Sequence, residues 1–199
     1  QACKLDPNFA EAWYNLAVIY TKTNKLDDAQ RCYHQAIKVK PDYPKAILNL
    51  GVLYAKKGNY REAAKNYRQV LKLQPDYAPA WFNLAIAANR LGELDNAIAA
   101  YRKVITINPK NIDAVKNVAS LYADKKDFQK ALSLFQQALA EQPEDYHLRY
   151  NYAVQEKKFG KKETAITELE RVIRLAPDFK KAWLELADAY SDSGKFTDA

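Results

Sequence analysis

The sequence predicts an all-α fold, a solenoid of antiparallel helix pairs. Its 199 residues include only 5 Gly and 8 Pro, which argues against short strands joined by tight turns. Prolines recur every 34 residues, at Pro7, Pro41, Pro75, Pro109, Pro143 and Pro177. Alanines keep the same interval, at Ala29, Ala63, Ala97, Ala131, Ala165 and Ala199. Two registers of one length identify internal repeats, which are typical of solenoids.

Each period of 34 residues is predicted to form one helical hairpin. Apolar or small residues at repeat positions 4, 7, 8 and 11 follow helical spacing, and so do those at 20, 24, 27 and 28. The proline, at position 32, ends the second helix because it lacks an N–H and disfavours helical geometry in the preceding residue. Complete repeats then span 10–43, 44–77, 78–111, 112–145 and 146–179, with the end of an earlier repeat at 1–9 and a partial repeat at 180–199.

These positions carry a known signature. The first repeat has Trp13, Leu16, Ala17, Ala29 and Tyr33 at positions 4, 7, 8, 20 and 24. The pattern resembles the tetratricopeptide repeat over essentially the whole chain. The resemblance implies a right-handed superhelix whose first helices line a concave groove. We expect residues 1–199 to form one such array and to be a slice of a longer protein.

Position 6 of the first helix, which faces the groove in that family, holds a repeated asparagine. The five residues are Asn15, Asn49, Asn83, Asn117 and Asn151. Asparagine is a mediocre residue inside a helix, because its amide competes for backbone hydrogen bonds. An amide also donates and accepts, which suits the main chain of an extended peptide. The row resembles the asparagine ladder in the repeat arm of O-linked N-acetylglucosamine transferases. The alternative is duplicated residues that simply face water.

Groove positions 5, 9 and 13 add apolar and basic side chains. The apolar set is Tyr14, Val18, Leu48, Val52, Phe82 and Ile86. The basic set at position 13 is Lys22, Lys56, Arg90 and Lys158, and further positive charge comes from Lys45, Lys116 and Lys157 at positions 2, 5 and 12. The partial sixth repeat is acidic instead, at Glu185, Asp188 and Asp192. We therefore expect a protein or peptide ligand with apolar anchors and acidic flanks. The alternatives are burial between repeats and a solvated basic rim.

The fifth repeat departs from the pattern at Arg149, Tyr152 and Glu156, where large apolar or aromatic residues are expected. Two interpretations are open for its first helix: it is rotated, or it faces a partner. The nearby tyrosines and lysines also suit nucleic acid. The residues concerned are Tyr146, Tyr150, Tyr152, Lys157, Lys158, Lys161 and Lys162.

Catalytic chemistry is not predicted for this chain. His34 and His147 lie more than three repeats apart, and neither Cys3 nor Cys32 has metal-ligand spacing. We expect no enzyme activity, no metal and no cofactor, although a catalytic domain outside the slice stays open. No membrane insertion is expected because no apolar run is long enough. The compartment is left open, with the cytoplasm as the default.

The leading functional hypothesis is a protein–protein interaction scaffold that binds an extended or helical peptide of a partner. The first alternative is the substrate-recognition arm of a larger glycosyltransferase-like enzyme. The second is a basic, nucleic-acid-binding helical repeat, which the net charge of +7 allows. Self-association through uncapped ends is a further possibility.

Overall fold

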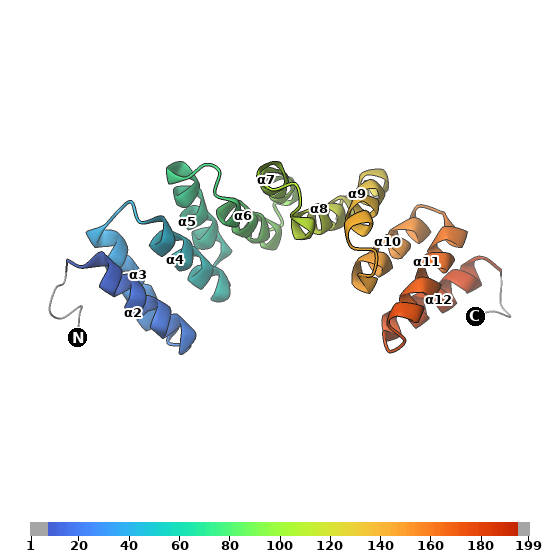
Figure 1. Cartoon of the computed structure of the whole chain (residues 1–199), viewed down its shortest axis with the longest axis horizontal. Coiled ribbons are helices and arrows are strands. Elements are labelled where there is room, and N and C mark those ends of the chain that lie inside the picture. Colours follow the sequence, from blue (N-terminus) through green and yellow to red (C-terminus); the bar gives the residue numbers. More distant parts are fainter. Residues whose placement is uncertain (1–7, 195–199) are drawn as a thin grey trace. The chain divides into compact units, whose positions relative to one another are not determined.

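The computed structural model describes residues 8–194, and within that range every regular element is a helix (Figure 1). The all-α fold class is therefore confirmed. The helices are α2 Ala10–Lys22, α3 Leu26–Val39, α4 Pro44–Lys56, α5 Tyr60–Leu73, α6 Ala78–Arg90, α7 Leu94–Ile107, α8 Ile112–Asp124, α9 Phe128–Glu141, α10 Tyr146–Lys158, α11 Lys162–Leu175 and α12 Lys180–Asp192.

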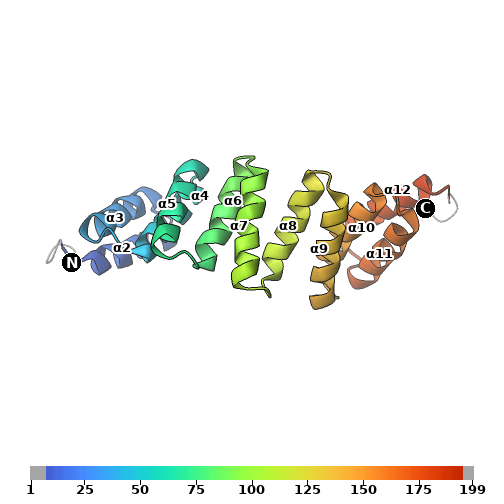
Figure 2. The ribbon, with the colours of Figure 1, turned by 90° about the horizontal axis from the view of Figure 1, so that it is seen from above.

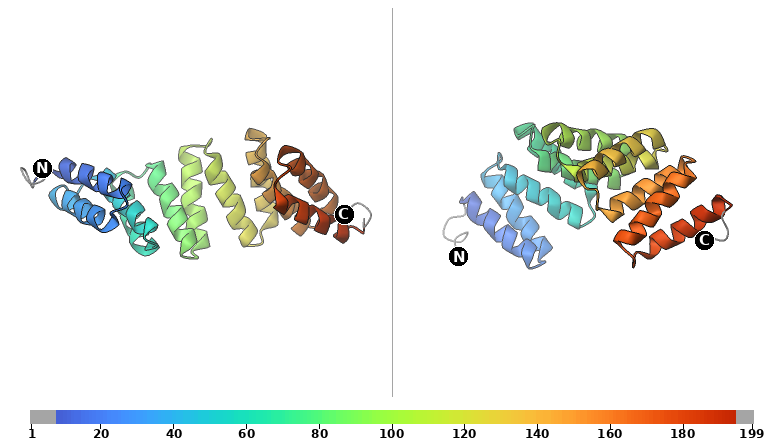
Figure 3. Two further views of the ribbon diagram at one scale, coloured as in Figure 1. Left: turned by 90° about the horizontal axis from the view of Figure 1, so that it is seen from below. Right: turned by 45° about the vertical axis from the view of Figure 1, so that its right-hand side comes forward.

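The helices fall into two compact units, divided between Asn108 and Pro109. In the first unit α2 pairs with α3, α4 with α5 and α6 with α7, and the pairs stack through α3 on α4 and α5 on α6 (Figure 2). In the second unit α8 pairs with α9 and α10 with α11, while α12 packs on α11 (Figure 3). Within each unit, successive helices are joined by turns of a few residues and so run antiparallel.

The turn inside each hairpin needs one residue in the left-handed region. Glycine fills this position in four repeats, whereas Asn24 and Lys126 adopt φ of 59° and 60°. Asparagine tolerates this conformation well, but lysine pays a steric cost of about 1 kcal/mol between its Cβ and the following carbonyl. The turn at Lys126 is still closed by the Asp127 N–H, which donates to the Tyr122 carbonyl at 2.9 Å. The hairpin geometry therefore holds even without the preferred residue.

Small residues let the two helices of each hairpin approach closely. Ala17, Ala29 and Tyr33 are buried together in the core of the first hairpin. In the second hairpin, a Cβ added to Gly51 would lie 2.6 Å from Cε1 of Tyr67. Such contacts leave no room for a larger side chain at this position. The aromatic ring at position 24 therefore fills the space beside a small residue at position 8.

The first helix of the fifth repeat, α10, keeps the register of its counterparts. Arg149 is 4% exposed, and its Nη2 donates to the Pro143 carbonyl at 2.6 Å. Trp81 Nε1 makes the same bond to the carbonyl of Pro75, at 2.7 Å. Arginine therefore replaces tryptophan as the donor at position 4. The interpretation that this helix is rotated is therefore wrong.

A polar network satisfies most of the other buried groups of α10. Arg149 forms an ion pair with Glu168 of α11. The hydroxyl of Tyr152 donates to Oε1 of Glu156 at 2.5 Å and accepts from Nε2 of Gln136 at 2.9 Å. Lys161 Nζ lies 3.5 Å from Oε2 of Glu156, whose side chain is 1% exposed. Charge pairing thus replaces apolar packing in this repeat.

Replacing Arg149 tests this reading of the network. Arg149→Ala leaves Glu168 and the Pro143 carbonyl unpaired, and we expect it to lower the free energy of unfolding by about 3–5 kcal/mol. Arg149→Trp with Glu168→Ala restores the Trp81–Ala100 combination of the third repeat and is expected to be neutral or stabilising. Urea unfolding followed by circular dichroism measures both. An alanine variant as stable as the wild type would contradict the network.

We expect the folded chain to lose stability at high pH because of two tyrosines in its core. Burial raises the pKa of Tyr67 and of Tyr101 to about 12. The folded chain therefore holds these protons more tightly than the unfolded chain does. This stabilisation is complete below pH 10 and is lost as the pH rises from 10 to 12, on the order of 2 kcal/mol for each tyrosine.

Tyr101→Phe is expected to flatten this loss, because phenylalanine has no proton to release. Its stability at pH 7 should stay within about 1.5 kcal/mol of the wild type, since the ring volume is conserved. Urea unfolding at pH 7, 10 and 11.5 gives the comparison. Equal slopes with pH for the variant and the wild type would rule out a contribution from Tyr101.

Candidate functional site

The predicted groove residues lie on the first helices of the repeats. The five asparagines, the six apolar residues and the cations Lys22, Lys56 and Arg90 all lie on α2, α4 and α6 of the first unit, except Asn117 on α8 and Asn151 on α10. Their positions, 5, 6, 9 and 13, are spaced by one, three and four residues, which places them on one side of each helix. We call the side of α2, α4 and α6 that carries positions 5, 6, 9 and 13 the groove-facing side. Nδ2 of Asn49 donates to the hydroxyl of Tyr14 at 3.2 Å, so this side of α4 adjoins that of α2.

The apolar part of the groove-facing side is half buried and half open. The ring of Tyr14 packs against Tyr43 with centroids 5.3 Å apart, and Phe82 packs edge-on against Tyr101 at 5.2 Å. Val18 and Leu48 are also half-buried. Val52 and Ile86 remain 41% and 37% exposed. The aromatic rings are therefore held in place by neighbours, and the aliphatic side chains form an open apolar surface between them.

The asparagines differ in their hydrogen bonding. Only Asn49 has a side-chain partner, Tyr14. Within residues 8–194, no hydrogen-bond partner is present for the other four amides. Asn15 and Asn151 are exposed, whereas Asn83 and Asn117 are half-buried. A half-buried amide without a partner has unused donors and acceptors for a ligand.

Ion pairing cancels positive charge in the second unit. Lys116 pairs with Asp145, and Nζ of Lys157 lies 2.5 Å from carboxylate oxygens of both Glu185 and Asp188. Burial opposes the charge on Lys157, but the hydrogen bonds to these two carboxylates outweigh it and raise the pKa of the lysine. The same pairing lowers the pKa of Asp188. These lysines are therefore committed within the chain.

Among the described residues, the groove cations of the first unit have no ion-pair partner. Lys22, Lys45, Lys56 and Arg90 are exposed, and within the described part of the chain none has a carboxylate within 4.0 Å. Nζ of Lys56 donates to the side chain of Asn24 at 3.0 Å, which leaves its charge uncompensated. The first unit thus combines the apolar side chains with an unpaired positive charge.

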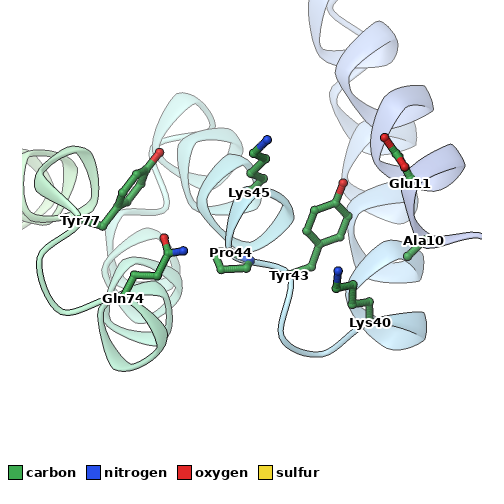
Figure 4. Close-up of a pocket in the computed structure, with 8 residues that line it drawn as sticks. All are labelled: Ala10, Glu11, Lys40, Tyr43, Pro44, Lys45, Gln74 and Tyr77. Carbon is green, nitrogen blue, oxygen red and sulfur yellow. The ribbon is translucent and has the colours of Figure 1, made fainter.

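A pocket of about 450 Å³ opens at the first residues of α2 and α4, beside the turn that precedes α6 (Figure 4). Tyr43 and Tyr77 stand on either side of Lys45, and Gln74 lies near Tyr77. Nζ of Lys40 lies 5.2 Å from the ring centroid of Tyr43, which also contacts Tyr14. The pocket therefore adjoins the groove-facing side. We did not predict it from the sequence, although the recurrence of Tyr43 and Tyr77 at position 34 was a visible signal.

The aromatic and basic residues of the fifth repeat, considered for nucleic acid, are largely engaged within the second unit. Tyr146 and Tyr150 pack edge-on against Phe179, at 5.4 and 5.1 Å. Tyr152 is buried, Lys161 faces Glu156, and Lys162 donates to the Asp192 carbonyl. Of this set, Lys158 on α10 and Lys161 remain exposed. Stacking platforms for bases are therefore not left open by these rings.

The histidine and cysteine side chains of the described residues do not form a metal site. Nε2 of His34 on α3 lies 3.3 Å from the hydroxyl of Tyr54, and the thiol of Cys32 is buried. Within residues 8–194 there is no group of three or more His, Cys, Asp or Glu side chains placed to hold a metal ion. No helix in that range has the length and apolar character needed to cross a membrane.

Solved structures with the same fold share little sequence with this chain. The crystal structure of YrrB, "a TPR protein with an unusual peptide-binding site", aligns with a TM-score of 0.81 and 21% identity, covering 92% of this chain and 95% of that one. MamA from Desulfovibrio magneticus RS-1 aligns with 0.80 and 18%, covering 85% and 96%. A tetratricopeptide repeat protein from Parabacteroides merdae ATCC 43184 aligns with 0.85 and 21%, covering 94% and 74%. These likenesses concern the fold.

Sequence comparison identifies the family. No curated protein matches the chain significantly. Three family models described as tetratricopeptide repeat match it, one at residues 48–112 and 156–199, one at 10–43 and one at 114–145. The predicted resemblance is confirmed, and the chain belongs to the tetratricopeptide repeat family.

Proposed function

We propose that this protein is an interaction scaffold that binds an extended segment of a partner protein along the groove-facing side of α2, α4 and α6. The observation that carries the proposal is the pairing of unused amides with an open apolar surface. Asn15 and Asn83 have no partner within the described residues, and Val52 and Ile86 are exposed beside them. Amides in such a row suit the repeated N–H and C=O groups of a peptide main chain.

Charge favours an acidic ligand. The unpaired Lys22, Lys56 and Arg90 project from the last turn of α2, α4 and α6, at the far end of each helix from the tyrosine pocket. At the pocket end, Lys40 and Lys45 face a single carboxylate, that of Glu11. Positive charge at both ends of the helices attracts the acidic flanks of a ligand to those ends, which leaves its apolar anchors over the middle. YrrB, which is described as having an unusual peptide-binding site, supports the proposal by analogy of fold.

Asparagine variants test the proposal directly. The probe is a peptide selected from a phage-displayed random library on the purified chain, and its affinity is measured by isothermal titration calorimetry. Asn15→Ala with Asn83→Ala removes two amides that have no role within the described fold. We expect the Kd to rise roughly 5- to 100-fold, since each hydrogen bond contributes about 0.5–1.5 kcal/mol. Phe82→Ala is expected to weaken binding as well, through loss of an aromatic anchor.

Gln35→Ala is the matched control, because Gln35 is an exposed amide on α3, away from the groove-facing side. Its Kd should equal that of the wild type. Circular dichroism checks that every variant remains helical. Unchanged affinity in both the double asparagine variant and the Phe82 variant, with intact helices, would place the peptide elsewhere and refute the proposal.

A further inference from the structure

A polar contact recurs between successive repeats, on a side of the first helix that the groove does not use. It joins position 11 of a first helix to position 25 of the second helix before it. The hydroxyl of Tyr54 lies 3.3 Å from Nε2 of His34, and the hydroxyl of Tyr190 donates to Oε1 of Glu170 at 2.6 Å. In both cases the tyrosine side chain occupies the cleft between the two helices.

The fifth repeat has no tyrosine at position 11 but preserves the link by other means. Its residue there is Glu156, which accepts from Tyr152, and Tyr152 in turn accepts from Gln136 at position 25. Tyr20 and Tyr122 occupy position 11 in the first and fourth repeats. A side chain able to reach across the cleft is therefore the rule at this position.

The third repeat breaks this rule. Its position 11 is Ala88, and position 25 of the preceding helix is Arg68, so no side chain fills the cleft from α6. A pocket of about 230 Å³ lies there, between α5, α6 and α7, which pack together in the first unit (Figure 2). The residues that matter to its chemistry are Arg68, Trp81, Leu84, Ala88, Ala100 and Lys103. In the preceding cleft, which Tyr54 partly occupies, the pocket is smaller, about 180 Å³.

The pocket combines a fixed aromatic wall with cations at its mouth. The indole of Trp81 is held by its bond to the Pro75 carbonyl, and Leu84 and Ala100 are buried beside it. Arg68 and Lys103 are exposed, and neither has an ion-pair partner in the described chain. An apolar hollow of this kind accepts a planar ring, and the cations attract negative charge next to that ring.

We propose that this pocket is a second binding site, which takes the side chain of a tyrosine flanked by acidic residues in a partner protein. The partner's ring supplies in trans the tyrosine that neighbouring repeats carry at position 11. Its flanking carboxylates pair with Arg68 and Lys103. The site is separate from the groove-facing side, because it uses positions 4, 7 and 11 of α6 and not 5, 6, 9 and 13.

The positive charge on the surrounding helices favours an acidic partner. On α5, Arg61, Arg68 and Lys72 recur at helical spacing, all exposed and without ion pairs in the described chain. Lys65, on the same side, lies 3.8 Å from Glu62. The pocket therefore opens beside a basic helix face, which attracts carboxylates and repels further cations.

Small probes test the pocket without a known partner. 4-Methylphenol is the tyrosine side chain, and 4-hydroxyphenylacetate adds a carboxylate. Both are titrated while the indole N–H resonance of Trp81 is followed by NMR, assigned by its absence in Trp81→Phe. We expect both to shift this resonance at millimolar concentrations. The carboxylate probe should bind about threefold to tenfold more tightly at low salt, and the advantage should shrink at high salt.

Ala88→Tyr is the decisive variant, because it installs the residue that four other repeats have at this position. It should obstruct the pocket and weaken the binding of both probes, seen as a smaller Trp81 shift at each probe concentration. Phe82→Ala, on the groove-facing side of the same helix, should leave both titrations unchanged, which separates this site from the proposed peptide groove.

A second variant keeps the proposal testable if Ala88→Tyr fails to fold. Arg68→Ala with Lys103→Ala alters only exposed side chains and should remove the preference for the carboxylate probe while 4-methylphenol still binds. The absence of any Trp81 shift, or equal affinity for the two probes at low salt, would overturn the proposal. Tighter binding of adenosine monophosphate than of either probe would also overturn it, in favour of a nucleotide site.

Discussion

The close contact between the two helices of each hairpin is the interaction on which the rest of the structure depends. It is made by a small residue at position 8, an alanine at position 20 and an aromatic or leucine side chain at position 24. At Gly51 the contact is so tight that one added carbon would collide with Tyr67. Because this contact fixes the backbone of each hairpin, the neighbouring positions are free to vary without changing the fold.

The third and fifth repeats show what that freedom permits. In the fifth, Arg149 takes over the hydrogen bond that Trp81 makes in the third, and Glu168 balances its charge. In the third, Ala88 stands where tyrosine is usual, and the result is a pocket instead of a collapsed helix pair. Substitutions that leave the hairpin backbone unchanged thus create a polar core in the fifth repeat and a pocket in the third. The first helices of both repeats keep their register.

The sequence predicted those features that depend on spacing along one helix. The 34-residue period gave the hairpins, and the proline at position 32 correctly marked where each second helix ends. It did not predict features that depend on contacts between repeats. The bond from Asn49 to Tyr14 and the pairing of Lys157 with Glu185 join residues some thirty positions apart. Their geometry follows from how the hairpins stack, so a list of groove positions overstated the free charge in the second unit.

Contacts between hairpins also explain why unpaired groove cations are concentrated in the first unit. Both units carry lysines at groove positions, but only the second supplies carboxylates within reach of Lys116 and Lys157. The first unit leaves Lys22, Lys56 and Arg90 without an ion pair among the described residues and places apolar side chains beside them. Helix α6 then presents Phe82 and Ile86 on one side and Trp81 and Ala88 on another. Because α6 packs against both α5 and α7, we expect the two proposed sites on α6 to bind their ligands independently.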